Sequence, residues 1–179
     1  MHELEHRFGV RFTTAEFLRM GECGAFDDMK VELVAGRLER SDLPMHRHAA
    51  LHAKIMIRLG QINVGARLLG AIGIDLGDDT VLECDVAVLR YAVAEDRWLR
   101  PDDVQLVVEI ADTNRSRDVG LKRVLYSTAD IPHYWVVDGD RSVVHVYGDP
   151  SDGDYSRVST VGFGEPLDVP GTDATIVID

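Results

Sequence analysis

The most informative part of the sequence runs from Val104 to Tyr126 and reads VQLVVEIADTNRSRDVGLKRVLY. Its first part, Val104 to Ile110, alternates with the period of a β-strand and places Glu109 on the less apolar face. The following residues predict a helix over Ser116 to Thr128, whose apolar side consists of Leu121, Val124 and Leu125. A strand followed by a helix in this way is typical of an α/β protein.

The first forty residues predict a short helix and a β-hairpin. The helix begins with a capping box, in which Thr13 and Glu16 satisfy each other's backbone N–H groups. The hairpin joins Lys30–Val34 to Arg37–Arg40 through Ala35-Gly36, because a two-residue connection with glycine between alternating runs favours a tight turn.

A long helix and two strands are predicted next. The helix spans His46 to Arg67, with one apolar stripe formed by Leu51, Ile55, Leu59 and Ile62. The strands are Leu68 to Leu76 and Thr80 to Arg90. On the second strand Asp85 shares a face with Glu83 and Ala87, opposite to Leu82, Cys84, Val86 and Val88.

Further strands follow the central helix. His133–Asp138 and Ser142–Tyr147 form a predicted hairpin about Gly139-Asp140, and weaker strands lie near Tyr155–Val161 and Ala174–Ile178. The order of elements predicts a mixed α/β fold with a sheet backed by helices. A length of 179 residues is suited to a single domain over residues 1–179.

The composition restricts the classes of function. The 31 acidic and 19 basic residues give a net charge of −12, which argues against an extended basic surface. Arginines concentrate in Arg47–Arg67 and Arg115–Arg123, so a nucleic-acid surface is expected to be local. Two cysteines, Cys23 and Cys84, make no disulfide framework, and Cys84 is expected to be a small buried residue.

Neither a membrane span nor a signal peptide is expected. No apolar run reaches the roughly 18 residues that a membrane helix requires. The first residues, Met1 to His6, are polar and lack the core of a signal peptide. A soluble, cytoplasmic protein is therefore predicted.

Two acids on apolar strands, Asp85 and Glu109, are candidate site residues. Each one alone is readily explained as a solvated strand end. Two such acids on two strands favour a shared site, because buried carboxylates must be paired or bind a metal. Mg²⁺ prefers such oxygen ligands.

Lys122 is the third candidate. It lies on the predicted helix after the Glu109 strand, in line with Asp118 and Tyr126 at four-residue spacing. The alternative is a surface ion pair between Asp118 and Lys122, which contributes little. Composition alone does not separate these two interpretations.

The stretch from Val107 to Tyr126 closely resembles the C-terminal motif of the Uma-type putative restriction endonucleases, a bacterial branch of the PD-(D/E)XK superfamily. The family pattern is a strand ending in Glu, a turn rich in Ser and Thr, and then Asp, Lys and Tyr at four-residue spacing. Weaker matches extend the resemblance over roughly Thr13 to Tyr147, at Val31–Leu38, His48, Asp85 and Ala129–Asp138.

This resemblance implies a restriction-endonuclease-like mixed sheet flanked by helices and a metal-dependent nuclease acting on nucleic acid, with DNA as the expected substrate. Asp85 and Glu109, with the Ile110 carbonyl, would hold Mg²⁺ or Mn²⁺. The metal would polarise the phosphate and lower the pKa of a water, which Lys122 would orient.

Other residues receive expected roles from the same resemblance. Glu32 would be an additional acidic ligand, and His48 would bind phosphate or orient Glu32. The expected substrate contacts are His48, Arg115, Arg117 and Tyr126.

The sequence departs from the family pattern at three places. Cys84 stands where the family usually has proline before the strand Asp, and Ala111 occupies the common superfamily position of the lysine. Lys122 on the helix therefore takes that role. The turn carries Asp112, Thr113 and Asn114 where small hydroxyl residues are usual, but no catalytic group is lost.

The sequence is compatible with alternative roles for some of these residues. Glu32 is equally explained by pairing with Lys30 or Arg37 across the hairpin. His46, His48 and His52 resemble a zinc cluster without a fourth ligand. The aromatic residues Trp98, Tyr134 and Trp135 are expected to be packing residues rather than base-stacking platforms.

The competing function is a non-catalytic module that keeps the nuclease fold and binds nucleic acid or protein. The acidic charge favours it, whereas the complete set of Asp85, Glu109 and Lys122 favours the enzyme. In either case a homodimer is expected from the resemblance and from the general frequency of two-fold dimers.

Overall fold

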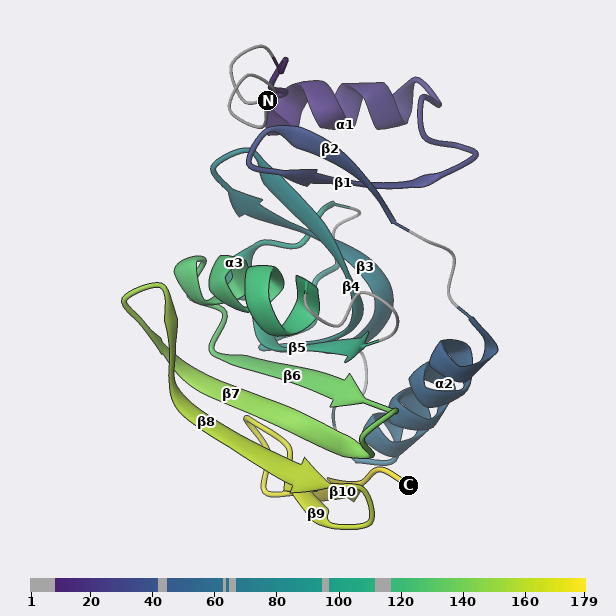
Figure 1. Cartoon of the computed structure of the whole chain (residues 1–179), viewed down its shortest axis with the longest axis vertical. Helices are drawn as coiled ribbons and strands as arrows, with labels where there is room; N and C mark the ends of the chain where they lie inside the picture. Colours follow the sequence, from purple (N-terminus) through teal and green to yellow (C-terminus); the bar gives the residue numbers. More distant parts are fainter. Residues whose placement is uncertain (1–8, 42–44, 63, 65–66, 95–96, 112–116) are drawn as a thin grey trace, which may run out of the picture. The chain divides into compact units, whose positions relative to one another are not determined.

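The computed structural model describes residues 9–41, 45–62, 64, 67–94, 97–111 and 117–179, which form two compact units. The first unit comprises the described residues up to 41 together with 75–82, and the second comprises those of 44–74 and 83–179. Strands β3 (Leu68–Gly77) and β4 (Thr80–Leu89) contribute residues to both units (Figure 1). The expectation of one domain over the whole chain stays a prediction.

In the first unit a helix accompanies the predicted hairpin. Helix α1 (Thr14–Glu22) begins with the expected capping box between Thr13 and Glu16. Strands β1 (Lys30–Val34) and β2 (Arg37–Ser41) pair as an antiparallel hairpin. The connecting residues Ala35 and Gly36 have φ angles of 46° and 78°, which is the left-handed conformation that a two-residue hairpin turn requires. The sequence prediction of this hairpin is confirmed.

The second unit contains a mixed sheet. Strand β4 pairs antiparallel with β5 (Val104–Ala111), and β5 pairs in parallel with β6 (His133–Asp138). The sheet continues through the antiparallel strands β7 (Val143–Ser151) and β8 (Asp154–Gly162). The parallel step needs a crossover, and the chain between β5 and β6 supplies it with η3 (Arg117–Lys122) and α3 (Arg123–Thr128).

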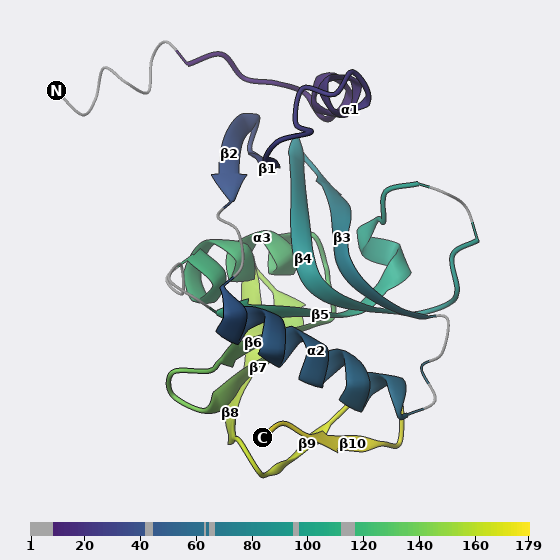
Figure 2. The ribbon, with the colours of Figure 1, turned by 90° about the vertical axis from the view of Figure 1, so that its right-hand side faces the viewer.

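Helices α2 (His46–Gly60) and α3 pack on opposite faces of this sheet. Consecutive residues of β6 point to opposite faces of the sheet. Trp135 packs in the core with Leu51 and Ile55 of α2. Tyr134 points the other way and contacts Tyr126 of α3, with ring centroids 5.0 Å apart. Figure 2 shows α2 running along its side of the sheet. The predicted α/β class, with a mixed sheet flanked by helices, is confirmed.

Three elements differ from the sequence prediction. Helix α2 ends at Gly60 rather than Arg67, and Ile62 reaches the same core from the following turn. The predicted helix over Ser116–Thr128 contains a π-helical first part, η3, before α3. A short strand, β9 (Pro166–Asp168), was not predicted and pairs with β10 (Thr175–Val177) in a separate sheet.

Asp103 organises the connection between β4 and β5. This buried carboxylate accepts two hydrogen bonds from the Arg97 guanidinium, at 2.7 and 2.9 Å. It also accepts from the Tyr91 hydroxyl at 3.0 Å and from the Arg100 backbone N–H at 2.8 Å. Hydrogen bonds from Arg97 hold the pKa of Asp103 well below its usual range, against the opposing effect of burial.

We expect Asp103→Asn to lower the free energy of unfolding at pH 7 by about 2–4 kcal/mol, because it weakens a buried charged network. A carboxylate with a depressed pKa stabilises the fold above its unfolded pKa of about 3.9, and this contribution is lost as pH falls through the folded pKa. Denaturation with urea across pH should therefore show the wild type and the variant converging below about pH 4. The half-buried carboxylate variant Asp154→Asn, which weakens the pair with Arg123, should lose about 1 kcal/mol at most. An equal loss in both variants would contradict the assignment.

Candidate active site

Glu109, Lys122 and Tyr126 form one buried hydrogen-bonded cluster. The Lys122 ammonium donates to Glu109 Oε1 at 2.7 Å, and the Tyr126 hydroxyl donates to the same oxygen at 2.8 Å. Lys122 also donates to the backbone carbonyl of Glu83 at 3.1 Å. The side chains of Glu109 and Lys122 are only 5% and 8% exposed, so this ion pair lies inside the protein.

The crossover between β5 and β6 brings these residues together. Glu109 points to the α3 face of the sheet, opposite to Val108 and Ile110, which belong to the α2 core. Lys122 is the last residue of the π-helical segment, and Tyr126 lies one turn later on α3. Both side chains therefore reach the Glu109 carboxylate. Single π-helical turns often occur at functional sites, where they redirect side chains.

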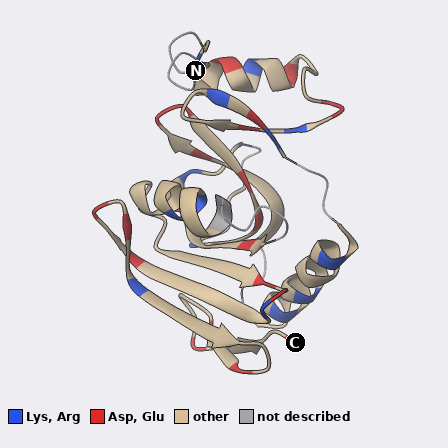
Figure 3. Cartoon of the chain, in the orientation of Figure 1, with Lys and Arg blue, Asp and Glu red and all other residues tan. Residues whose placement is uncertain are grey.

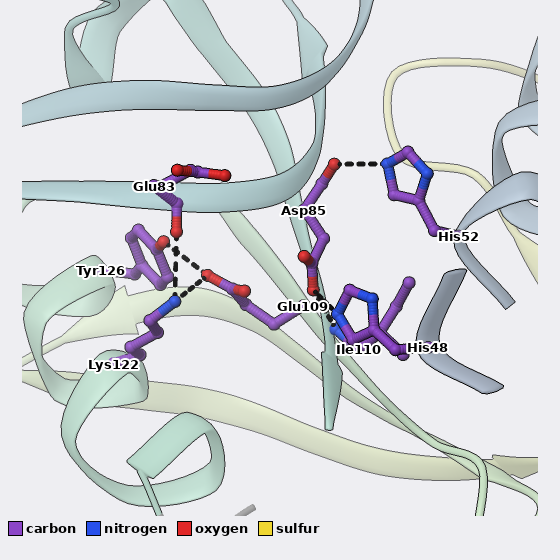
Figure 4. A network of polar contacts seen from close by, with 8 residues as sticks. All are labelled: His48, His52, Glu83, Asp85, Glu109, Ile110, Lys122 and Tyr126. Carbon is purple, nitrogen blue, oxygen red and sulfur yellow. Dashed lines mark hydrogen bonds and ion pairs between the residues drawn. The ribbon is translucent and has the colours of Figure 1, made fainter. Parts of the chain in front are cut away.

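Asp85 lies on β4 next to the backbone that follows Glu109. Its Oδ2 atom accepts from the Ile110 N–H at 2.7 Å and lies 3.1 Å from Nε2 of His48. The Asp85 backbone carbonyl is 3.0 Å from Nε2 of His52 (Figure 4). Because Ile110 directly follows Glu109, these contacts bring Asp85 and Glu109 into one site.

The pKa of Asp85 is lower than that of an ordinary aspartate. Burial raises this pKa, but the hydrogen bond and charge of His48, the Ile110 N–H and the charge of Lys122 together outweigh that effect. The Asp85 side chain is 23% exposed, much more than Glu109. Asp85 is therefore ionised, and its carboxylate is accessible to solvent.

The oxygen-rich donors at this site fit a hard divalent cation. Within the described residues, no three His, Cys, Asp or Glu side chains are grouped as a metal cluster. The candidate ligands for a cation are the two carboxylates of Asp85 and Glu109, which a backbone carbonyl and water would complement. Mg²⁺ is commonly bound in this way, through one or two carboxylates and several waters.

The remaining candidate residues have different positions. Glu32 is buried on β1 in the first unit. Arg115 lies outside the described residues, and only the backbone of Arg117 is described. Tyr126 is fully buried and its hydroxyl donates to Glu109, and the expected contact of Tyr126 with substrate stays a prediction. The prediction that Tyr134 and Trp135 are packing residues is confirmed, because both are 0% exposed.

The structure adds three contacts to those expected from sequence. His48 pairs with Asp85, His52 contacts the Asp85 carbonyl, and the Glu83 carbonyl accepts from Lys122. The one-turn spacing of His48 and His52 was the available signal, since it places both rings on one side of α2. The Glu83 acceptor is a backbone carbonyl, which every residue has, so the sequence does not indicate it.

The charge is unevenly distributed over the described elements. Helix α2 contains no acidic residue, and Figure 3 shows its Lys and Arg positions in blue. Arg47, Lys54 and Arg58 of this helix contact Asp140 or Asp179. The basic side chains of α2 are therefore largely used in contacts within the second unit.

We expect Lys122→Met to lower the free energy of unfolding by about 3–5 kcal/mol, because the Glu109 carboxylate would remain buried without its counter-charge. The double variant Lys122→Met/Glu109→Gln should recover part of that loss. Chemical denaturation measures both, with Arg157→Ala as a control, since the exposed Arg157–Asp149 pair should contribute at most about 1 kcal/mol. A loss of only a few tenths of a kcal/mol would restore the interpretation of Lys122 as a solvated helix residue.

Comparisons with known proteins show which fold and family this chain resembles. Its fold is similar to the crystal structure of a putative nuclease from Anabaena variabilis, with a TM-score of 0.70 and 18% sequence identity over 93% of this chain and 95% of that one. No curated protein matches the chain. The model of the Uma2 family, described as putative restriction endonuclease, matches residues 14–177. This chain therefore belongs to the Uma2 family of putative restriction endonucleases.

Proposed function

We propose that this protein is a metal-dependent endonuclease that hydrolyses phosphodiester bonds in DNA. The proposal rests on the position of Asp85 on β4. Its carboxylate accepts from the backbone of the neighbouring strand β5, whose Glu109 forms an ion pair with Lys122. Membership of a nuclease family supports nucleic acid as the substrate. The two carboxylates are suited to Mg²⁺ or Mn²⁺.

In the proposed reaction, Asp85 and Glu109 would hold the cation from two adjacent strands. The Ile110 carbonyl would be a third ligand, since the N–H and C=O of one residue in an extended strand point to the same side, and this N–H donates to Asp85. When bound, the cation supplies Lewis acidity that polarises the scissile phosphate and lowers the pKa of a water.

The remaining residues of the site position groups and balance charge. Lys122 orients the attacking water and offsets negative charge that develops on the phosphate. Tyr126 and the Glu83 carbonyl fix the Glu109–Lys122 pair, and His48 orients the Asp85 carboxylate. His48 is 15% exposed, so a contact with the phosphate is part of the same proposal.

We expect Mn²⁺ or Mg²⁺ to raise the melting temperature of the wild type, because a ligand bound only by the native state stabilises it. Asp85→Asn should abolish this rise and reduce cleavage of plasmid DNA by about 100-fold or more. The control Asp149→Asn removes an exposed carboxylate and should keep both properties. An unchanged response of Asp85→Asn to Mn²⁺ would refute the assigned metal site.

A non-catalytic binding module is the second candidate, favoured by the net charge of −12. The same experiment separates the two functions. Metal stabilisation without cleavage of single- or double-stranded DNA or RNA by the wild type would favour the binding module, whereas cleavage that depends on Asp85 excludes it.

We also propose that the protein acts as a homodimer, the commonest oligomeric state of soluble proteins. Light scattering at micromolar concentration should then give a molar mass of about twice the 19.9 kDa of one chain. The mass of a single chain at this concentration would contradict the proposal.

A further inference from the structure

Two aromatic side chains are exposed in the connection between β4 and β5. Tyr91 is 52% exposed and Trp98 is 44% exposed, whereas Trp135 is completely buried. Trp98 therefore lies at the surface, outside the buried core. Large aromatic side chains contribute much binding energy when a partner covers them, so two of them in one surface segment indicate a contact surface.

The buried carboxylate of Asp103 holds both aromatic residues in place. It accepts from the Tyr91 hydroxyl, and it binds Arg97 and the Arg100 backbone on either side of Trp98. The Leu99 N–H also donates to the Gly73 carbonyl at 3.2 Å, which ties the segment to β3. A surface held in this way loses little conformational entropy when it binds a partner.

The Trp98 ring packs directly on Gly73 of β3. A Cβ atom at Gly73 would lie 1.7 Å from Cζ3 of this ring, so only glycine leaves room for it. Strand β3 pairs with β4, and the Ile72 backbone contacts the Cys84 thiol, in the residue before Asp85. The Trp98 ring therefore packs against β3, the strand that pairs with the Asp85 strand β4.

Arginines with no carboxylate partner among the described residues flank these aromatic residues in the sequence. Several arginines among the described residues of the second unit form ion pairs with carboxylates, including Arg47, Arg58, Arg97, Arg123, Arg141 and Arg157. Arg90 and Arg100 are exposed and form no such pair; Arg90 Nε donates to the neutral Val104 carbonyl. Their positive charges are available for an anionic partner in a protein whose net charge is −12.

We propose that Tyr91 and Trp98 form a stacking platform for the bases of single-stranded nucleic acid, with Arg90 and Arg100 contacting its phosphates. The inference rests on the proposed function for the class of partner. Duplex bases stack on each other, whereas unpaired bases present their faces to aromatic side chains. The platform therefore binds an unpaired strand beside the site rather than an intact duplex.

The binding test uses wild-type protein in EDTA, so that no metal-dependent cleavage takes place. Only two tryptophans occur in the chain, and Trp135 is buried, so quenching of tryptophan fluorescence by oligothymidine reports on Trp98. Anisotropy of a labelled oligothymidine gives the affinity. We expect Trp98→Ala to weaken binding by about 10-fold or more and Trp98→Phe to retain most of it.

A second pair of variants tests the geometry and the charge. Gly73→Ala keeps the tryptophan but displaces its ring, and it should weaken binding in the same direction. Arg100→Gln should reduce the slope of log affinity against log salt by about 0.7, the value for one phosphate contact on a single strand. Val158→Ala, which changes another exposed apolar residue, and Arg157→Gln, which removes a paired arginine, are the matched controls.

Equal affinity of the wild type and folded Trp98→Ala for oligothymidine would overturn the inference, as would equal weakening by Val158→Ala. Binding of duplex alone, or of a protein partner in place of oligothymidine, would also overturn it. Metal-dependent cleavage without oligothymidine binding at Trp98 would support the proposed nuclease activity and contradict the stacking platform. Trp98-dependent binding without any cleavage would support the stacking platform and contradict the nuclease activity.

Discussion

The burial of the Glu109 carboxylate is the constraint on which the rest of the structure depends. An ionised carboxylate transferred from water to the interior loses hydration worth many kcal/mol, so it requires a counter-charge and hydrogen-bond donors at close range. Lys122 and Tyr126 supply both at the same oxygen. The segment that carries them must therefore return to the sheet directly after β5, which is the role of η3 and α3.

The same crossover explains why the sheet has two different faces. The α2 face is a continuous apolar core that includes Val108, Ile110 and Trp135. The α3 face instead combines tyrosine rings with the polar cluster around Glu109. An apolar core on one side stabilises the strands, so the other side can hold a charged pair whose net contribution to stability is small or unfavourable. The proposed function, rather than stability, therefore accounts for this charged pair.

Local neutralisation is a general feature of this acidic chain. Carboxylates of the second unit repeatedly fix a turn or a connection through an arginine, as Asp103 does with Arg97 and Asp138 with Arg141. Both acids are almost completely buried, and each also accepts backbone N–H groups. The negative charge is thus partly structural, and a strongly acidic composition is compatible with small surfaces that attract a polyanion.

Most secondary structure was predictable because it depends on local patterns. The capping box at Thr13, the left-handed Ala35-Gly36 turn and the alternation along β4 and β5 are each encoded within a few residues. The C-terminal end of α2 and the π-helical turn were not predictable, because packing and the demand for a partner to Glu109 determine them. Strand β9 was missed because its three residues carry too little periodicity and depend on pairing with β10.

The sequence by itself determined which chemical groups are present and which strands carry them, since alternation places Asp85 and Glu109 and the motif resemblance selects Lys122. Tertiary structure alone decided how these groups meet. It paired Asp85 with His48 and the Ile110 N–H, buried Tyr126 on Glu109 and left Trp98 at the surface. The physical reason is that hydrogen bonds and burial depend on distances between segments far apart in the chain, and those distances are set only when strands, helices and the crossover pack together.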